Sequence, residues 1–356
     1  MKRLEKIFRS NIDILFFQIS NFAFSPLLYF LLGTGRLDNG LDLLKTIYLI
    51  EVYLAVPAVI FYFNQRKISA LVDTFGKPLY DAIAVVKILL SAATGLVVVF
   101  VSKAIELQLL SVFILCLIGN AITPHWLLSQ YSYTRFTLAS FIFRLSVLAA
   151  TLFGFEQLLL PLYTVSLLAP GLFAYAYFRN RISKGSGATV WPVVASIGAS
   201  GSISLVRTFA SSTLLFSIIS LVPPNTLSIY ATLERVIRSG FSFMVPYILR
   251  LNLRSGIHMK TQLLPILLLV AGALTIYFFH AHSYLLLLLL AVTVLSLDLL
   301  AFIFSEQAGS NLASRSYYIV IIGLFVASFF GFYSFLILLA LLALLPFLVR
   351  SSEHIS

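Results

Sequence analysis

Residues 79–101 read LYDAIAVVKILLSAATGLVVVFV, an apolar run in which only Asp81 and Lys87 are charged. A run of this length is typical of a helix that crosses a bilayer, because about 20 helical residues span the hydrocarbon core. Similar apolar runs recur along the chain from Ile14 to Leu348. Each is longer than an ordinary soluble core helix needs. The sequence therefore predicts an all-helical protein that crosses a membrane many times.

The composition of the chain also indicates a membrane protein. Of its 356 residues, 60% are hydrophobic and 10% are charged, whereas soluble domains are about 45–50% apolar and about 25% charged. These proportions exclude an ordinary soluble globular protein. Its one cysteine, Cys116, excludes a disulfide framework and a cysteine metal site. At roughly 30 residues for each span and loop, the length predicts about 12 spans and no separate soluble domain.

Glycine, proline and charged residues mark the breaks between the expected spans. The spans lie near 11–32, 43–63, 79–101, 104–128, 134–154, 157–178, 192–221, 225–249, 262–279, 283–305, 317–331 and 333–349. Pro26 and Pro57 predict kinks within the first two. A basic linker at 179–190 separates two predicted six-helix lobes, residues 1–178 and 191–356. Equal lobes are typical of transporters that work by alternating access.

The distribution of lysine and arginine predicts the orientation of the chain. Sixteen of these residues fall on one side of the predicted spans, against Arg36, Lys103 and the border residue Lys45 on the other. Short loops rich in positive charge stay in the cytoplasm. We therefore expect both termini and the linker to be cytoplasmic. Because the net charge of +11 mostly reflects this topology, we expect no nucleic-acid partner.

Eight ionisable residues are expected near mid-depth in the predicted spans, where a charge costs about 3 kcal/mol and usually faces a cavity or a partner. The bases are Lys87, Arg144, Arg207, Arg235 and Arg238, and the acids are Glu51, Glu234 and Asp298. Five bases minus three acids leave a charge of +2. This surplus predicts a central cavity that binds an anion, and arginine suits bidentate contacts with phosphate.

Some of these residues also have structural interpretations. Glu234 and Arg238 are spaced i, i+4, which predicts an internal salt bridge as readily as a substrate contact. Arg207 has no acidic residue within a turn and lies on a helix rich in serine, glycine and threonine. For Arg207 we expect substrate contact, with an inter-helix ion pair as the alternative. Arg144 and Lys87 are candidates for substrate contact or for a pair with Glu51.

The three acids are also candidates for a second role, the coupling of transport to an ion. Glu51 and Asp298 are candidates for carboxylates that couple transport to H⁺ or Na⁺, and Glu234 is a further candidate for coupling or charge pairing. The alternative is neutralisation by the cations named above.

Motifs of membrane enzymes are missing from the sequence. It contains no Gly-x4-Gly-Lys-Ser/Thr loop, no His-Glu-x-x-His and no Asp-x-Asp. We therefore expect no catalytic residues, no metal site and no cofactor other than a coupling ion. A membrane sugar polymerase or ligase would need a sizeable outer loop, and the predicted outer loops are short.

Residues 119–130, GNAITPHWLLSQ, resemble the fourth span of bacterial O-antigen and polysaccharide flippases. Pro124 and Trp126 match the Pro-x-Trp of that family. The family continues with Gln-Gly-x-Glu, and here that stretch is replaced by Ser129, Gln130 and Ser132.

Residues 221–236, LVPPNTLSIYATLERV, resemble the turn and eighth helix of the same family. Tyr230 and Glu234 match, Arg235 replaces a lysine conservatively, and Pro246 falls where the family has a proline. The sequence departs from the family at Ser228 and Leu233.

The resemblance implies the multidrug/oligosaccharidyl-lipid/polysaccharide exporter fold, which is MATE-like, with two six-helix lobes around a cavity lined by spans one, two, seven and eight. It further implies a non-enzymatic flippase of the bacterial inner membrane. The substrate would be undecaprenyl-diphosphate-linked oligosaccharide, and the partners would be membrane lipid and other polysaccharide-assembly membrane proteins. A drug or cation exporter of the same fold is the alternative, and it should have a net acidic cavity. A sugar polymerase or ligase and an accessory subunit are further alternatives.

Overall fold

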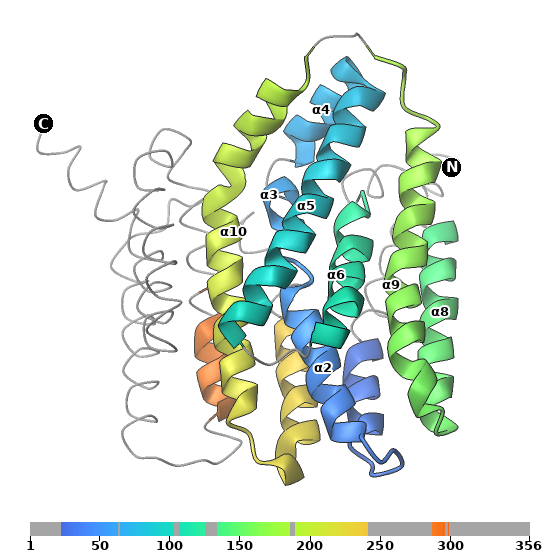
Figure 1. Cartoon of the computed structure of the whole chain (residues 1–356), viewed down its shortest axis with the longest axis vertical. Helices are drawn as coiled ribbons and strands as arrows, with labels where there is room; N and C mark the ends of the chain where they lie inside the picture. The colour runs from blue at the N-terminus through green and yellow to red at the C-terminus, as the bar shows by residue number, and fades with distance from the viewer. Residues whose placement is uncertain are drawn as a thin grey trace, which may run out of the picture. The chain divides into compact units, whose positions relative to one another are not determined.

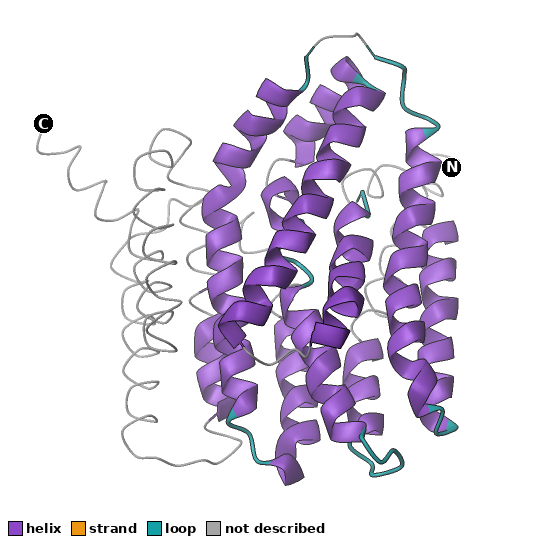
Figure 2. Ribbon diagram, in the orientation of Figure 1, coloured by secondary structure: helices purple, strands orange, loops and turns teal. Residues whose placement is uncertain are grey.

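The computed structural model describes residues 23–62, 65–102, 107–124, 134–185, 189–240, 287–295 and 298. These residues form helices and their connections, and no strand occurs among them (Figure 2). The predicted all-helical class is therefore confirmed for this part of the chain. The predicted spans at 262–279, 317–331 and 333–349 lie outside the described residues, as do both termini.

The described helices follow the predicted spans with two differences. The predicted span 43–63 is divided into two helices, and residues 65–75, which the prediction left between spans, form a further helix. In chain order the described helices are residues 23–32, α2 (Gly40–Tyr53), α3 (Val59–Tyr62), α4 (Gln65–Phe75), α5 (Lys77–Ser102), α6 (Leu107–Ile122), α8 (Thr134–Leu152), α9 (Glu156–Arg179), α10 (Trp191–Ser220), the 3₁₀ turn η1 (Pro224–Thr226), residues 227–240 and residues 287–295 (Figure 1).

Two of these helices, α5 and α9, are long and apolar enough to cross a membrane. A bent pair, Ser204–Ser220 and Pro224–Gly240, meets the same criterion when taken together, with an angle of 113° between its halves. Shorter apolar helices occupy Ala23–Leu32, Leu109–Ile122 and Leu138–Leu152. The described part thus supports membrane insertion with two or three spanning helices, and the total of about 12 stays a prediction.

Helix α5 exposes apolar residues and buries polar ones. Val85 and Leu89 are 46% and 61% exposed, whereas Lys87, Ser91 and Thr94 are buried. The three buried residues follow an i, i+4, i+7 spacing, so they share one face of the helix. An amphipathic helix in water has the opposite arrangement. The exposed face of α5 therefore suits contact with lipid.

The predicted break at Pro57 is present as a non-helical turn between α2 and α3. The turn leaves the carbonyl of Leu54 outside the regular helix ladder, and Asn120 Nδ2 of α6 donates to that oxygen at 2.7 Å. A neighbouring helix thus satisfies the freed carbonyl, as a broken helix in lipid requires. Pro26 lies in the first described turn of its helix, so the break predicted there stays a prediction.

Helix α4 is absent from the predicted spans, because its polar sequence is typical of a loop between two of them. Ile68 and Val72 are one turn apart and buried. They pack in a hydrophobic cluster that includes Phe61, Phe178 and Ile197. A short amphipathic helix therefore covers one end of the core formed by α3, α5, α9 and α10.

The chain forms two compact units, Met1–Leu205 (unit 1) and Val206–Ser356 (unit 2), with the boundary inside α10. Within unit 1, α9 packs against α6 and α8, and α5 packs against α6 (Figure 1). A Cβ atom added to Gly171 would collide with the backbone oxygen of Gly119, so only glycine permits this approach of α9 to α6. The predicted lobe boundary at 179–190 stays a prediction.

Candidate functional site

Glu51 is the centre of a hydroxyl cluster in unit 1. Ser25 donates to its Oε1 at 2.6 Å, Tyr29 to its Oε2 at 2.7 Å and Tyr163 to its Oε1 at 3.2 Å. Ser25 and Tyr29 lie on helix 23–32 and Tyr163 on α9, so the carboxylate of α2 joins three helices. Glu51 is only 6% exposed. Hydrogen bonds from hydroxyl groups offset part of the cost of burying a carboxylate.

Arg144 of α8 approaches the same cluster through aromatic rings. Its guanidinium carbon lies 5.3 Å from the ring centroid of Phe24. Phe24 in turn stacks on Tyr163, with their centroids 6.4 Å apart. Two aromatic rings thus lie between Arg144 and the Glu51 cluster, and the predicted pair of Arg144 with Glu51 stays a prediction.

Lys87 lies on the buried polar face of α5. Its Nζ is 5.5 Å from the ring centroid of Phe61, a cation–π contact. Ser91 Oγ donates back to the carbonyl oxygen of Lys87 at 2.8 Å, which satisfies the serine within its own helix.

Arg207 contacts Asp298 in unit 2. Arg207 Nη1 donates to the backbone oxygen of Asp298 at 2.8 Å and lies 3.6 Å from its Oδ2. The side chains are 6% and 27% exposed. The structure therefore shows an inter-helix ion pair, the alternative interpretation of Arg207. Contact of Arg207 with a substrate stays a prediction.

Glu234 and Arg238 form a bidentate salt bridge on helix 227–240. Arg238 Nε donates to Glu234 Oε1 at 2.8 Å, and Arg238 Nη2 donates to Oε2 at 2.7 Å. The Glu234 side chain is fully buried. The predicted i, i+4 pair is present, and two parallel bonds make it a strong one. Arg235 adds a second positive charge to the same helix.

The structure accounts for each of the three predicted acids. Glu51 accepts three hydroxyl hydrogen bonds, while Glu234 and Asp298 each face an arginine. Among the eight ionisable residues predicted near mid-depth, unit 1 contains two bases and one acid, and unit 2 contains three bases and two acids. Among these eight residues, each unit therefore has one more base than acids.

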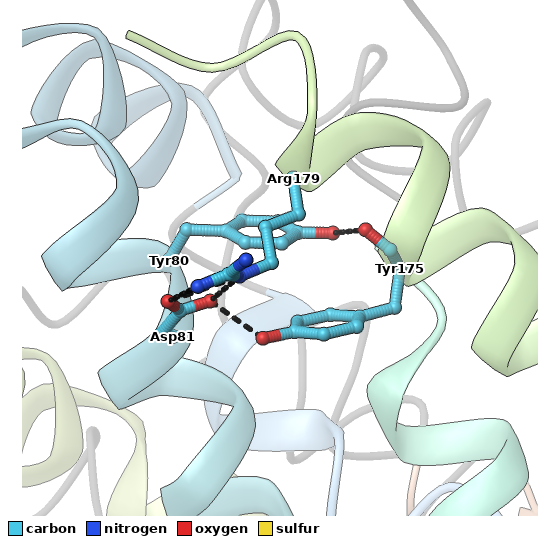
Figure 3. A network of polar contacts seen from close by, with 4 residues as sticks. All are labelled: Tyr80, Asp81, Tyr175 and Arg179. Atoms are coloured by element: carbon cyan, nitrogen blue, oxygen red, sulfur yellow. Dashed lines mark hydrogen bonds and ion pairs between the residues drawn. The ribbon is translucent and has the colours of Figure 1, made fainter. Parts of the chain in front are cut away.

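A second polar network lies where α5 begins and α9 ends (Figure 3). Arg179 Nε donates to both Asp81 oxygens, at 2.9 and 3.1 Å, and Arg179 Nη2 donates to Oδ2 at 2.9 Å. Tyr175 Oη donates to Asp81 Oδ1 at 2.5 Å. Tyr80 stacks on Tyr175 with ring centroids 5.1 Å apart and donates to its backbone oxygen at 3.3 Å. No local pattern predicts this network, since 98 residues separate Asp81 from Arg179.

Polar contacts also connect the chain at both ends of α9. At its start, Asn39 Nδ2 donates to Glu156 Oε1 at 2.6 Å. At its end, the Lys77 backbone N–H donates to the oxygen of Ser183 at 3.0 Å. The predicted topology requires the same pairing, because it places residues 39 and 156 on one side and residues 77 and 183 on the other. Which side faces the cytoplasm stays a prediction.

The residues that carry the family resemblance are only partly described. Tyr230, Glu234 and Arg235 lie on helix 227–240, and Pro124 is buried just after α6. Trp126 and Pro246 lie outside the described residues, as do Ser129, Gln130 and Ser132. Comparisons with protein-family models, curated proteins and solved structures find no match for the chain. The described residues contain no cluster of three or more His, Cys, Asp or Glu side chains able to hold a metal ion.

Proposed function

We propose that the chain is a flippase that moves polyprenyl-diphosphate-linked oligosaccharide across the bacterial inner membrane by alternating access. The observation that carries this proposal is the charge balance among apolar helices. Among the eight ionisable residues predicted near mid-depth, the three acids are engaged by hydroxyl groups or arginines, and the bases outnumber the acids by one in each unit. A diphosphate is the anionic part of such a substrate, and guanidinium groups bind phosphate oxygens in a bidentate manner.

Arg235 is the first candidate for contact with the diphosphate in unit 2. Residues 227–240 contain Glu234, Arg235 and Arg238, a net charge of +1, and Arg238 is the arginine that pairs with Glu234. Arg207, Arg238, Arg144 and Lys87 are the further candidates. In this proposal the polyprenyl tail stays in lipid, next to exposed apolar faces such as that of α5.

Coupling to H⁺ or Na⁺ is part of the proposal, with Glu51 as the candidate carboxylate. Three hydroxyl oxygens surround its two carboxylate oxygens, so a site rich in oxygen already exists there. Asp298 and Glu234 are weaker candidates, because arginine side chains engage both.

The main rival is a drug or cation exporter of the same fold. Such a protein should have a surplus of acids among its buried charges, whereas the five bases and three acids predicted near mid-depth leave a surplus of bases. A sugar polymerase or ligase would need a sizeable outer loop, whereas the predicted outer loops are short. The charge balance therefore favours an anionic substrate.

The experiment is a flipping assay with the purified full chain in proteoliposomes. An oligosaccharide linked through diphosphate to a short polyprenol is placed in both leaflets, and a glycosidase outside the vesicles reports which glycans reach the outer leaflet. We expect complete digestion with the protein and about half without it. The Arg235→Ala variant should flip slowly, and Arg235→Lys should recover part of the rate because the charge returns without the bidentate geometry. Equal digestion with and without the protein would refute the proposal.

A further inference from the structure

We propose that the end of unit 1 formed by the start of α5 and the end of α9 binds the headgroup of an anionic phospholipid. The proposed site is a stripe on α9 and the turn after it, made of Phe173, Tyr177 and Arg181, with Lys184 and Lys77 beside it. The three residues of the stripe are four positions apart, so they follow one another along one side of the helix.

The charges at this end of unit 1 are mostly positive. The cations are Lys77, Arg179, Arg181 and Lys184, the acids are Asp73 and Asp81, and four minus two leaves +2. Asp81 is already bound by Arg179 in a bidentate pair, which keeps it from neutralising the other cations (Figure 3). Arg181 and Lys184 are exposed, and neither forms a hydrogen bond or an ion pair through its side chain with any residue in the described part of the chain.

Aromatic contacts hold Arg181 in place. Its guanidinium carbon lies 4.1 Å from the ring centroid of Tyr177, and Phe173 stacks on Tyr177 from the preceding turn with their centroids 6.1 Å apart. Phe178 adds an edge contact to Tyr177 at 5.2 Å. A guanidinium that lies on a ring keeps its N–H donors free at the edge. The stack therefore prepares Arg181 to donate to a phosphate.

The backbone beneath these cations is fixed to the start of α5. Gly76 and Gly185 both have positive φ, 67° and 76°. A Cβ atom on Gly185 would collide with the backbone oxygen of Phe75, so the two turns touch through their backbones. The bond from the Lys77 N–H to Ser183 adds to this contact. The fold thus holds the segment after α9 beside the first residue of α5.

The neighbouring surface identifies the ligand as a lipid instead of a soluble phosphate. Leu172 and Phe173 are 50% and 46% exposed, and they lie on α9 about two turns before Arg181, which is in the turn after this helix. An acyl chain fits this apolar surface, the Tyr177 ring suits the interface, and the phosphate meets Arg181. Clusters of basic residues at the membrane surface attract anionic lipids, with a gain equivalent to about five-fold in affinity per residue. The proposal does not depend on the proposed flippase activity.

The test is native mass spectrometry of the full chain exchanged into mixed micelles with phosphatidylglycerol or phosphatidylcholine. We expect phosphatidylglycerol adducts to predominate, to fall about five-fold in Arg181→Ala and to fall further when Lys184→Ala is added. Arg181→Lys should recover only part of the binding. Arg36→Ala, which removes an exposed cation from the opposite end of unit 1, is the matched control and should bind normally.

Thermal unfolding of each variant should match the parent protein, because the three substituted side chains, Arg181, Lys184 and Arg36, are exposed. Three results would overturn the proposal. They are equal binding of both lipids, an equal loss in Arg36→Ala, and displacement of phosphatidylglycerol from this site by a short polyprenyl diphosphate at equimolar concentration. The last result would assign the stripe to the transported substrate.

Discussion

Individual buried charges of this protein are held by partners from distant parts of the chain. Glu51 accepts hydrogen bonds from residues 26, 22 and 112 positions away. A buried carboxylate without partners would be costly, and each hydroxyl donor lowers that cost. The cluster therefore both stabilises unit 1 and keeps a carboxylate inside it.

Removing the Tyr29 hydroxyl tests the Glu51 cluster. Tyr29→Phe should lower the free energy of unfolding by about 2 kcal/mol, because a hydrogen bond to a charged group is lost without a change of shape. Tyr163→Phe is the control, and its longer bond of 3.2 Å should cost less. In a Glu51→Gln background the effect of Tyr29→Phe should shrink, as measured by unfolding in mixed micelles. An unchanged effect in that background would show that Tyr29 acts elsewhere.

Single and double substitutions test the role of the Glu234–Arg238 salt bridge. Glu234→Ala or Arg238→Ala alone should each destabilise the protein by about 3–5 kcal/mol, because one buried charge remains uncompensated. The double variant should recover most of the inserted protein, measured as the folded fraction extracted from membranes. Arg235→Ala is the neighbouring control and should insert normally. If the double variant inserts but does not flip substrate, Arg238 contributes to transport beyond its salt bridge; full activity would limit it to the bridge.

Among the helical elements, the break between α2 and α3 depends on a neighbouring helix. Pro57 explains why the helix stops, but only α6 explains why the break is stable. Asn120 satisfies the carbonyl of Leu54, which water cannot reach in a lipid environment. A residue 66 positions away thus completes the local structure of the second predicted span.

Asn120→Leu should therefore destabilise unit 1 by about 1–3 kcal/mol, since a part-buried carbonyl is left without its donor. The change should raise hydrogen exchange at residues 54–59 more than elsewhere. Asn39→Leu removes the same type of amide donor from an exposed end and should cost less than about 1 kcal/mol. Equal costs for the two substitutions would mean that the break is stabilised by other contacts.

At the scale of the molecule, contacts within unit 1 show which connections lie at the same end of its helices. The start of α9 touches residue 39, and the segment after its end touches residue 77. The first contact places the start of α2 beside the start of α9, and the second places the start of α5 beside the end of α9. Together they constrain the directions in which α2, α5 and α9 run relative to one another. The predicted topology satisfies these contacts.

Accessibility labelling tests that topology. Single cysteines introduced as Asp38→Cys, Phe155→Cys and Ser183→Cys lie at exposed positions, and Cys116→Ala removes the buried native thiol. In intact cells an impermeant maleimide should label the first two and not the third, because the basic side is expected to be cytoplasmic. Labelling of Ser183→Cys together with the absence of labelling at 38 and 155 would show that the orientation is opposite to the predicted one. Labelling at only one of 38 and 155 would contradict the topology itself.

Local patterns in the sequence were enough to predict the helical class, the suitability for a membrane and the positions of most described helices. Each of these depends on the length and period of nearby apolar residues. In α5 and α9 the expected ranges 79–101 and 157–178 match Lys77–Ser102 and Glu156–Arg179 closely. The Glu234–Arg238 bridge could also be predicted from the sequence, because its partners lie one turn apart.

Long-range partners, in contrast, became visible only in the folded chain. The pairs are Arg207 with Asp298, Tyr29 with Glu51, and Arg179 with Asp81. Their members are 91, 22 and 98 residues apart in the sequence. Helix packing brings them together, and no pattern within a single helix encodes which helices become neighbours.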